Sequence, residues 1–115
     1  MPSKTKIAIV GSRDFAELDK VRDYVNSLPL DCIIVSGGAR GVDRVAEQTA
    51  SVRGMQTIIF KPDWEKHGKA AGFIRNHDII QAADSVVAFW DGTSKGTKNS
   101  IDLATKLNKP CTILK

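Results

Sequence analysis

The sequence is poor in cysteine and in aromatic residues. Its 115 residues include two cysteines, Cys32 and Cys111, and aromatic residues make up 6% of the chain. Two cysteines cannot build a framework of several disulfides, and no Cys-x-x-Cys pair or Cys/His cluster indicates a metal site. We expect both thiols to be reduced and buried, because each lies in a segment predicted as a strand. We expect neither a metal nor a resident cofactor.

Long apolar runs and a strong net charge are also missing. No stretch approaches the roughly 20 apolar residues of a membrane-spanning helix. The opening MPSKTKIAIVGS has neither the length nor the cleavage site of a signal peptide. Seventeen Lys and Arg against thirteen Asp and Glu give a net charge of +4, which suits an anionic ligand but is weak evidence for nucleic acid. These features predict a cytoplasmic protein that does not bind membranes.

Apolar runs alternate regularly with helical patterns. Hydrophobic residues make up 42% of the sequence, enough for the core of one domain spanning residues 1–115. Strands that read as continuous Ile, Val and Ala runs between amphipathic helices are typical of a parallel sheet buried on both faces. We therefore predict an α/β fold, a Rossmann-like three-layer sandwich with a five-stranded parallel sheet. The predicted strands are residues 6–10, 31–35, 57–60, 85–90 and 110–114, and the predicted helices cover about 15–28, 42–54, 69–82 and 97–107.

The third predicted helix carries an apolar face. Ala70, Phe73, Ile74, His77 and Ile80 recur at helical spacing, so we expect this face to pack on the sheet and His77 to be half-buried. The loop before this helix contains Trp64, which is either a lid over a ligand or an anchor against the helix.

Glycine, hydroxyl and charged residues gather after three of the strands. The segments are GSRDF (11–15), SGGARGVDR (36–44) and DGTSKGTKNS (91–100), whereas the returns from helix to strand are short and plain. In a parallel sheet all three segments leave the carboxyl edge, where ligands bind near the point at which the strand order reverses. Turns and helix caps explain any one segment, but three on one edge favour a binding site.

Each of these segments leads into a helix, whose first N–H groups attract anions. None matches the GxxxxGK[ST] or GxGxxG pattern, so a mononucleotide or a nucleotide fragment fits better than a dinucleotide cofactor. We predict that the ligand is bound by glycine N–H groups, hydroxyls and cationic side chains. The predicted ligand-binding residues are Gly11, Ser12, Arg13, Ser36, Gly37, Gly38, Arg40, Gly41, Asp43, Arg44, Gly92, Thr93, Ser94, Gly96 and Thr97.

Four motifs in order resemble one superfamily. GSRDF, SGGARGVDR, PDWEKHGKAAGFIRN and FWDGTSKGT together resemble the SLOG superfamily, and most closely its small YspA/YpsA-related branch. The superfamily also includes the Rossmann domain of DNA-processing protein A and the "lonely guy" phosphoribohydrolases. The resemblance covers residues 6–114. It implies a Rossmann-like domain that binds nucleotides or nucleotide-derived molecules, and it allows a homo-oligomer.

The resemblance to the hydrolases is partial. Residues 75–79, RNHDI, resemble their Arg-Lys-x-x-Met helix, which implies ligand contacts for Arg75 and Asn76. Residues 91–100 resemble their Pro-Gly-Gly-x-Gly-Thr-x-x-Glu loop, but the glutamate falls on Ser100. A serine hydroxyl cannot replace a catalytic carboxylate. We therefore take Arg75 and Asp91 as the candidate catalytic residues, Asp91 because it follows the fourth strand at the expected reversal of strand order.

Three functions are consistent with these features. We favour a module that senses or processes a nucleotide or nucleotide-derived small molecule. The first alternative is an enzyme that cleaves the N-glycosidic bond of a nucleotide. The second is single-stranded nucleic-acid binding, which the low net charge and the few aromatic residues disfavour.

Overall fold

All five strands lie parallel in one sheet, in the order β3-β2-β1-β4-β5. The computed structural model describes residues 4–114 of the chain, so residues 1–3 and 115, which the single-domain prediction included, lie outside the described residues. The predicted five-stranded parallel sheet is confirmed. The strands are β1 (Lys6–Gly11), β2 (Ile33–Ser36), β3 (Gln56–Ile59), β4 (Ser85–Phe89) and β5 (Cys111–Leu114).

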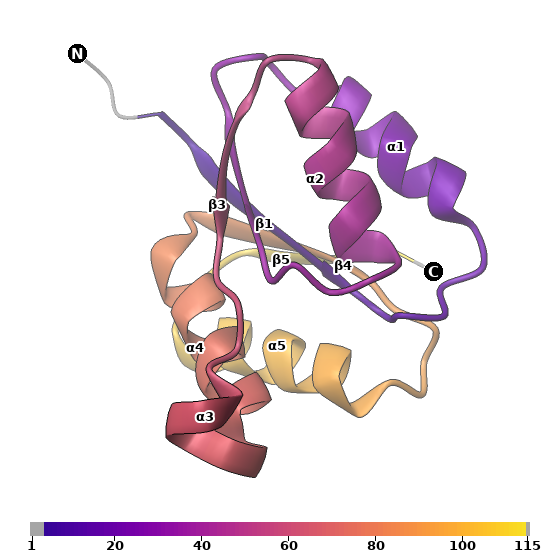
Figure 1. Cartoon of the computed structure of the whole chain (residues 1–115). Coiled ribbons are helices and arrows are strands. Elements are labelled where there is room, and N and C mark those ends of the chain that lie inside the picture. The colour runs from indigo at the N-terminus through magenta and orange to yellow at the C-terminus, as the bar shows by residue number, and fades with distance from the viewer. Residues whose placement is uncertain (1–3, 115) are drawn as a thin grey trace.

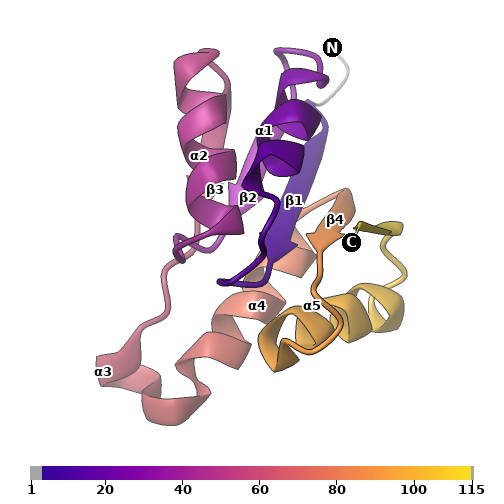
Figure 2. The same cartoon turned by 90° about the vertical axis from the view of Figure 1, so that its right-hand side faces the viewer.

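Two pairs of helices cover the two faces of this sheet (Figures 1 and 2). On one face α1 (Leu18–Asn26) and α2 (Val42–Val52) pack over Ile9 and Ile34. On the other face α4 (Ala71–Ala82) and α5 (Lys95–Lys106) pack over Ala8 and Val35. Alternate residues of β1 and β2 thus enter opposite cores, which is why both strands are apolar throughout. The predicted three-layer sandwich is confirmed.

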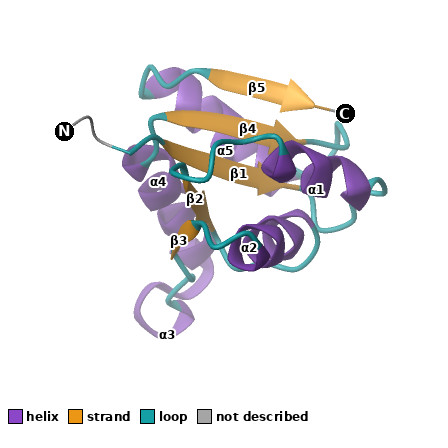
Figure 3. Ribbon diagram, turned by 90° about the horizontal axis from the view of Figure 1, so that it is seen from above, coloured by secondary structure: helices purple, strands orange, loops and turns teal. Residues whose placement is uncertain are grey.

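The direction of winding reverses between β1 and β4. From β1 the chain moves outward through β2 to β3, then crosses to the other side of β1 and adds β4 and β5 (Figure 3). Gly11 at the end of β1 pairs in register with Phe89 at the end of β4. The loops after these two strands therefore diverge to opposite faces, and this divergence opens a site at the carboxyl edge.

Helix boundaries differ from the sequence prediction in two places. The first helix begins at Leu18 rather than near residue 15, because Phe15 is part of a loop and places its buried ring against Phe89. Residues 64–67, predicted as a loop, form the short helix α3 (Trp64–His67), and the 3₁₀ turn η1 (Gly68–Ala70) joins it to α4. The Asp63 side chain accepts a hydrogen bond from the N–H of Lys66 and so caps α3.

The buried face of α4 was predicted wrongly. The helix buries Ala71, Asn76, Ile79 and Ile80, whereas Phe73 and His77 are exposed. The apolar spacing favoured a face with Phe73 and His77, but the helix is rotated so that Asn76 faces α5. Asn76 can be buried there because its amide finds hydrogen-bond partners.

The two thiols differ in burial. Cys32 is buried, but Cys111 is only partly buried because β5 is an edge strand. Burial raises the pKa of both thiols. Between residues 4 and 114, no group of three His, Cys, Asp or Glu side chains is placed to hold a metal ion. None of the helices in this part of the chain has the length and apolar character needed to cross a membrane.

Candidate functional site

A cleft of about 430 Å³ opens at the carboxyl edge of the sheet, between the ends of β1 and β4. The loops after β1, β2 and β4 form its sides, and α4 and the first turns of α5 complete it. Eleven of the predicted site residues line this cleft. They are Gly11, Ser12, Arg13, Asp43, Arg75, Asn76, Asp91, Thr93, Ser94, Gly96 and Thr97.

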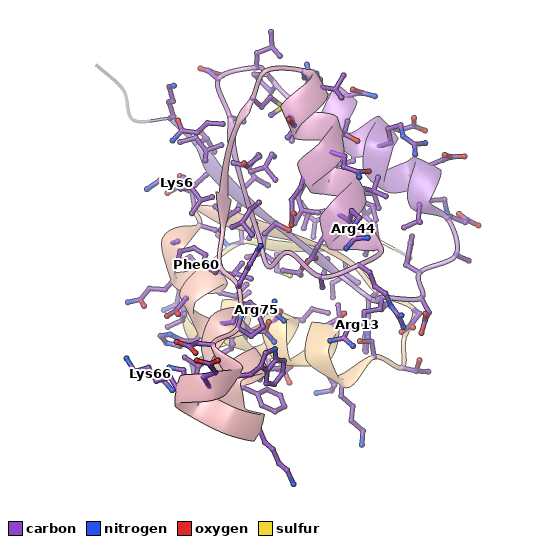
Figure 4. All side chains as sticks on the ribbon, in the orientation of Figure 1. Lys6, Arg13, Arg44, Phe60, Lys66 and Arg75 are labelled. Atoms are coloured by element: carbon purple, nitrogen blue, oxygen red, sulfur yellow. The ribbon has the colours of Figure 1, made fainter. Side chains whose placement is uncertain are left out.

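Seven predicted residues are not part of the cleft lining. Arg40 and Arg44 are exposed beyond it on the β2–α2 side, and Figure 4 shows Arg44 on the first turn of α2, apart from Arg75. Ser36 is buried at the end of β2, and its hydroxyl has no hydrogen-bond partner within the described residues. The others are Gly37, Gly38, Gly41 and Gly92.

The glycine-rich loop after β2 directs its backbone donors into the protein. The N–H groups of Gly37 and Ala39 donate to Oδ2 of Asp43, at 3.2 and 3.3 Å. The N–H of Gly38 donates to Oε2 of Glu47 at 2.9 Å. Two carboxylates of α2 thus occupy the position that the sequence assigned to a phosphate. Phosphate binding by Gly37 and Gly38 stays a prediction, and the loop itself is held by charge-assisted hydrogen bonds.

Asp43 is a buried carboxyl group at the edge of the cleft. Burial raises its pKa to about 6, while the N–H groups of Ala39 and Gly37 and the charge of Arg75 act in the opposite direction. Glu47 adds to the increase through charge repulsion. A carboxyl group with a pKa near neutrality can both take up and release a proton.

Arg75 links α4 to the loop after β2. Its guanidinium donates to the carbonyl of Gly37 at 2.7 Å and to Oδ1 of Asn76 at 3.1 Å. Burial lowers the pKa of Arg75, and the nearby Asp43 partly restores it, so the group stays positively charged at neutral pH. Arg75 therefore brings a partly buried positive charge into the cleft (Figure 4).

Asn76 links α4 to the other side of the cleft. Its side-chain N–H₂ donates to Oδ1 of Asn99 at 3.1 Å and to the carbonyl of Gly96 at 3.4 Å. Because its oxygen already accepts from Arg75, Asn76 joins the β2 loop to α5 through one continuous set of hydrogen bonds.

Asp91 holds the turn that starts α5. Its Oδ1 accepts from the N–H groups of Thr93 and Ser94, at 2.9 and 2.8 Å. These two bonds lower the pKa of the exposed Asp91, so it is ionised at neutral pH and has no proton to give as a general acid. Catalysis by Asp91 stays a prediction, and its evident role is to shape the loop.

The first turn of α5 presents backbone donors to the cleft. Ser94 caps the helix by accepting from the N–H of Thr97, which leaves the N–H groups of Lys95 and Gly96 without a partner inside the helix. A Cβ atom added at Gly96 would meet no atom within 4 Å other than those of its chain neighbours and its own helical turn. Glycine is disfavoured in helices, and here the fold does not require it.

Other glycines of the site are required by packing. A Cβ atom at Gly11 would lie 2.6 Å from the side chain of Val42, and one at Gly41 would lie 2.4 Å from the carbonyl oxygen of Arg13. Gly41 also has φ of +80°, a conformation that side chains disfavour. Of the two glycines that line the cleft, Gly96 is therefore the one at which an added Cβ atom meets open space rather than protein.

Comparison with known proteins identifies the family. A model of the YspA, cpYpsA-related SLOG family matches residues 5–67 of the chain. The chain belongs to this SLOG family. It is also 34% identical to the Gene 61 protein of Mycobacterium phage D29, over 91% of this chain and 92% of that protein.

The same fold occurs in two solved structures of DNA processing protein A. The Streptococcus pneumoniae protein superposes with a TM-score of 0.84 and 20% identity, over 96% of this chain and 50% of that chain. The Helicobacter pylori protein, described for its single-stranded DNA binding mode, superposes with a TM-score of 0.74 and 24% identity. That match covers 98% of this chain and 66% of the other. This chain thus corresponds to only part of either protein.

The family match covers half of the cleft. Residues 5–67 contain the loops after β1 and β2, whereas Arg75, Asn76 and the loop before α5 lie beyond it. Sequence reasoning missed several residues of this SLOG site. Val10 and Ile79 line it with apolar side chains, and Ala39 lines it from the β2 loop. Because these three residues are apolar, the sequence indicated only a packing role for them. Glu47 was also missed, although its position one turn after Asp43 on α2 places both carboxylates on one helix face.

Proposed function

We propose that the cleft binds a nucleotide unit, with its phosphate against the first turn of α5. The observation that carries the proposal is the free space at Gly96, beside backbone donors that have no partner inside the helix. Arg75 brings a positive charge into the same cleft, and Arg13 lies close enough to Arg75 to lower its pKa. Two cationic groups and a helix N-terminus favour a phosphate over a neutral ligand.

The dimensions and lining of the cleft also support a nucleotide. A volume of about 430 Å³ lies within the roughly 300–1,000 Å³ of small-molecule sites. Ser12 and Thr97 supply hydroxyl groups for the ribose and phosphate, and Val10 and Ile79 supply apolar contact. We propose that a free nucleotide or nucleotide derivative is the ligand, which makes the protein a sensing or processing module.

Titration calorimetry of purified protein with 5′-AMP tests this proposal. Gly96→Asp places a carboxylate in the cleft, yet an acidic residue in the first helical turn is compatible with folding. We expect the affinity for 5′-AMP to fall about tenfold or more, because the new carboxylate and the phosphate of the ligand then repel each other within the cleft. Gln48→Glu, at an exposed position on α2, is the matched control for net charge and is expected to bind like the wild type. Full affinity of a folded Gly96→Asp variant would refute the phosphate position.

Single-stranded DNA is a second candidate ligand. It is favoured by the likeness to the Helicobacter pylori protein described for its single-stranded DNA binding mode, and by the exposed Arg40 and Arg44 beside the cleft. A strand would place one nucleotide in the cleft and its neighbouring phosphates near these arginines. In that case a short oligothymidylate binds more tightly than 5′-AMP, and its affinity falls steeply with salt concentration. Equal or weaker oligonucleotide binding favours the small molecule.

Hydrolysis of an N-glycosidic bond is a third candidate, favoured by the pKa of about 6 at Asp43. Asp14, Asp43 and Asp91 all line the cleft, and the raised pKa of Asp43 suits it to proton transfer near neutral pH. The activity predicts release of ribose 5-phosphate from 5′-AMP, lost in Asp43→Asn and kept in Asp91→Asn. No release by the wild-type protein would refute this candidate and leave binding intact.

A further inference from the structure

A half-exposed tryptophan lies against the first turn of α4, outside the lining of the cleft itself. Trp64, the first residue of α3, has 55% of its surface exposed. The helix α3 and the turn η1 project from the body of the molecule, away from the sheet (Figures 1 and 2). Single exposed apolar residues are common on protein surfaces, so a role for this indole depends on what lies beside it.

The indole of Trp64 rests on α4 at Gly72. A Cβ atom added at Gly72 would lie 3.8 Å from Cη2 of Trp64, which is ordinary contact distance. One side of the ring is therefore supported by the helix backbone, and more than half of the residue remains open to solvent. The Asp63 cap holds the short helix that carries the ring.

Gly72 belongs to the face of α4 that lines the cleft. Arg75, Asn76 and Ile79 line the cleft, and Gly72 precedes them by three, four and seven residues, so all four share one helix face. Gly72 is outside the cleft lining, but it lies about 6 Å along the helix axis from Asn76. The indole that rests on Gly72 therefore extends this helix face beyond the cleft, toward the start of α4. The neighbouring Lys66 and Lys69 add positive charge to the same segment.

We infer that Trp64 stacks on the nucleobase of the ligand and makes the site selective for phosphates that carry a base. This inference rests on the proposed nucleotide binding at the cleft. A flat aromatic surface recognises any base by its π face, which suits both a free nucleotide and one unit of a single strand. The phosphate groups and the ribose are then held by the cleft, and the base by the indole.

Comparison of two ligands tests the inference. Calorimetry is carried out with 5′-AMP and with ribose 5-phosphate, which carries the same sugar and phosphate without a base. We expect Trp64→Ala to weaken 5′-AMP binding roughly 5- to 100-fold, to leave ribose 5-phosphate binding unchanged, and Trp64→Phe to restore most of the loss. A short oligothymidylate is measured in parallel. If the natural source of the base is a single strand, Trp64→Ala weakens oligothymidylate binding more than 5′-AMP binding.

Phe73→Ala is the matched control. Phe73 is exposed to a similar extent, 56%, but lies about 100° around the helix from Gly72, so its loss is expected to leave both affinities unchanged. Equal losses for both ligands in Trp64→Ala, or no loss for either, overturn the inference while nucleotide binding stands. A wild-type protein that binds neither ligand overturns the proposed function and this inference together. A change of oligomeric mass in Trp64→Ala, measured by light scattering, would assign the indole to a contact between two copies and overturn the inference.

Discussion

The guanidinium of Arg75 donates a hydrogen bond of 2.7 Å to the carbonyl oxygen of Gly37. This bond joins α4 to the loop after β2, across 38 positions of sequence. A Cβ atom at Gly37 would lie 2.6 Å from the same guanidinium, so a side chain there would displace Arg75 from this position. The two sides of the cleft are thereby held at a defined separation, and its shape depends on Arg75.

Replacement of Arg75 is expected to affect both stability and binding. Arg75→Ala leaves the Gly37 carbonyl without this donor and removes the positive charge beside Asp43, so we expect a loss of about 1–3 kcal/mol in the free energy of unfolding. Phosphate-bearing ligands should also bind more weakly. Arg75→Lys keeps the positive charge but not the paired hydrogen-bond geometry of the guanidinium. Its stability and its ligand affinity are expected to lie between those of the wild type and those of Arg75→Ala. Chemical denaturation and calorimetry measure the two effects.

The control for Arg75 is an exposed arginine that does not line the cleft. Arg22 lies exposed on α1, where it pairs with Asp19. Arg22→Ala lowers the net charge by the same amount and is expected to change stability by well under 1 kcal/mol. If Arg22→Ala weakened ligand binding as much as Arg75→Ala, the effect would be one of overall charge rather than of the cleft.

Asp43 is expected to make stability fall as the pH rises. Its pKa is about 6 in the folded protein, against the ordinary 3.8 of an exposed carboxyl group, so the folded state holds more protons between these values. Stability from this group is therefore greatest below pH 4 and is lost as the pH rises through 6. The shift of about two units corresponds to roughly 3 kcal/mol. Asp43→Asn removes this contribution.

Denaturation at several pH values separates Asp43 from the other carboxyl groups. We expect the stability of Asp43→Asn relative to the wild type to increase between pH 4 and pH 7. The asparagine oxygen can still accept from Gly37 and Ala39, since both donate to one oxygen of Asp43. A difference that stays constant over this pH range would contradict the raised pKa.

The edge of the sheet at which the cleft opens was predictable, but the hydrogen bonding within the cleft was not. Apolar runs such as KIAIV and SVVAF identified the strands, and parallel strands place the loops that follow them at one edge. That Gly37 and Gly38 donate to Asp43 and Glu47 depends on how α2 lies against its own loop. Those contacts join side chains and backbone six and nine residues apart, and no local pattern encodes their direction.

The sequence pattern failed to predict the orientation of α4 for a related reason. Phe73 and Ile74 are more hydrophobic than Asn76, so the pattern favoured burying them. Asn76 is buried instead because Asn99 and Gly96 satisfy its amide, and these partners lie 20 or more residues away. The exposure of Phe73 is thus the consequence of a polar contact that only the folded chain brings together.

Gly11 is expected to be sensitive to a single methyl group. A Cβ atom there would lie 2.6 Å from three side-chain atoms of Val42, which is fully buried. Gly11→Ala should therefore destabilise the protein by about 1–3 kcal/mol, as overpacking does. Val42→Gly removes all three contacting atoms, so the double variant Gly11→Ala, Val42→Gly is expected to lose less than the sum of the single losses. Simple additivity in thermal unfolding would contradict the contact.

Gly96→Ala is expected to raise stability and to weaken binding. Alanine is the better helix former by up to about 1 kcal/mol, and nothing beyond its chain neighbours and its own helical turn lies within 4 Å of the new methyl group. With the phosphate bound at this turn as proposed, the methyl group lies beside the N–H groups that hold it, so 5′-AMP should bind less tightly. Gly72→Ala is the matched control on α4, since its methyl group would meet Trp64 at an ordinary 3.8 Å. We expect it to raise stability without weakening ribose 5-phosphate binding. Unchanged nucleotide affinity in Gly96→Ala would mean that the ligand does not approach the backbone at this turn, and the phosphate would have to be sought nearer Arg13 and Arg75.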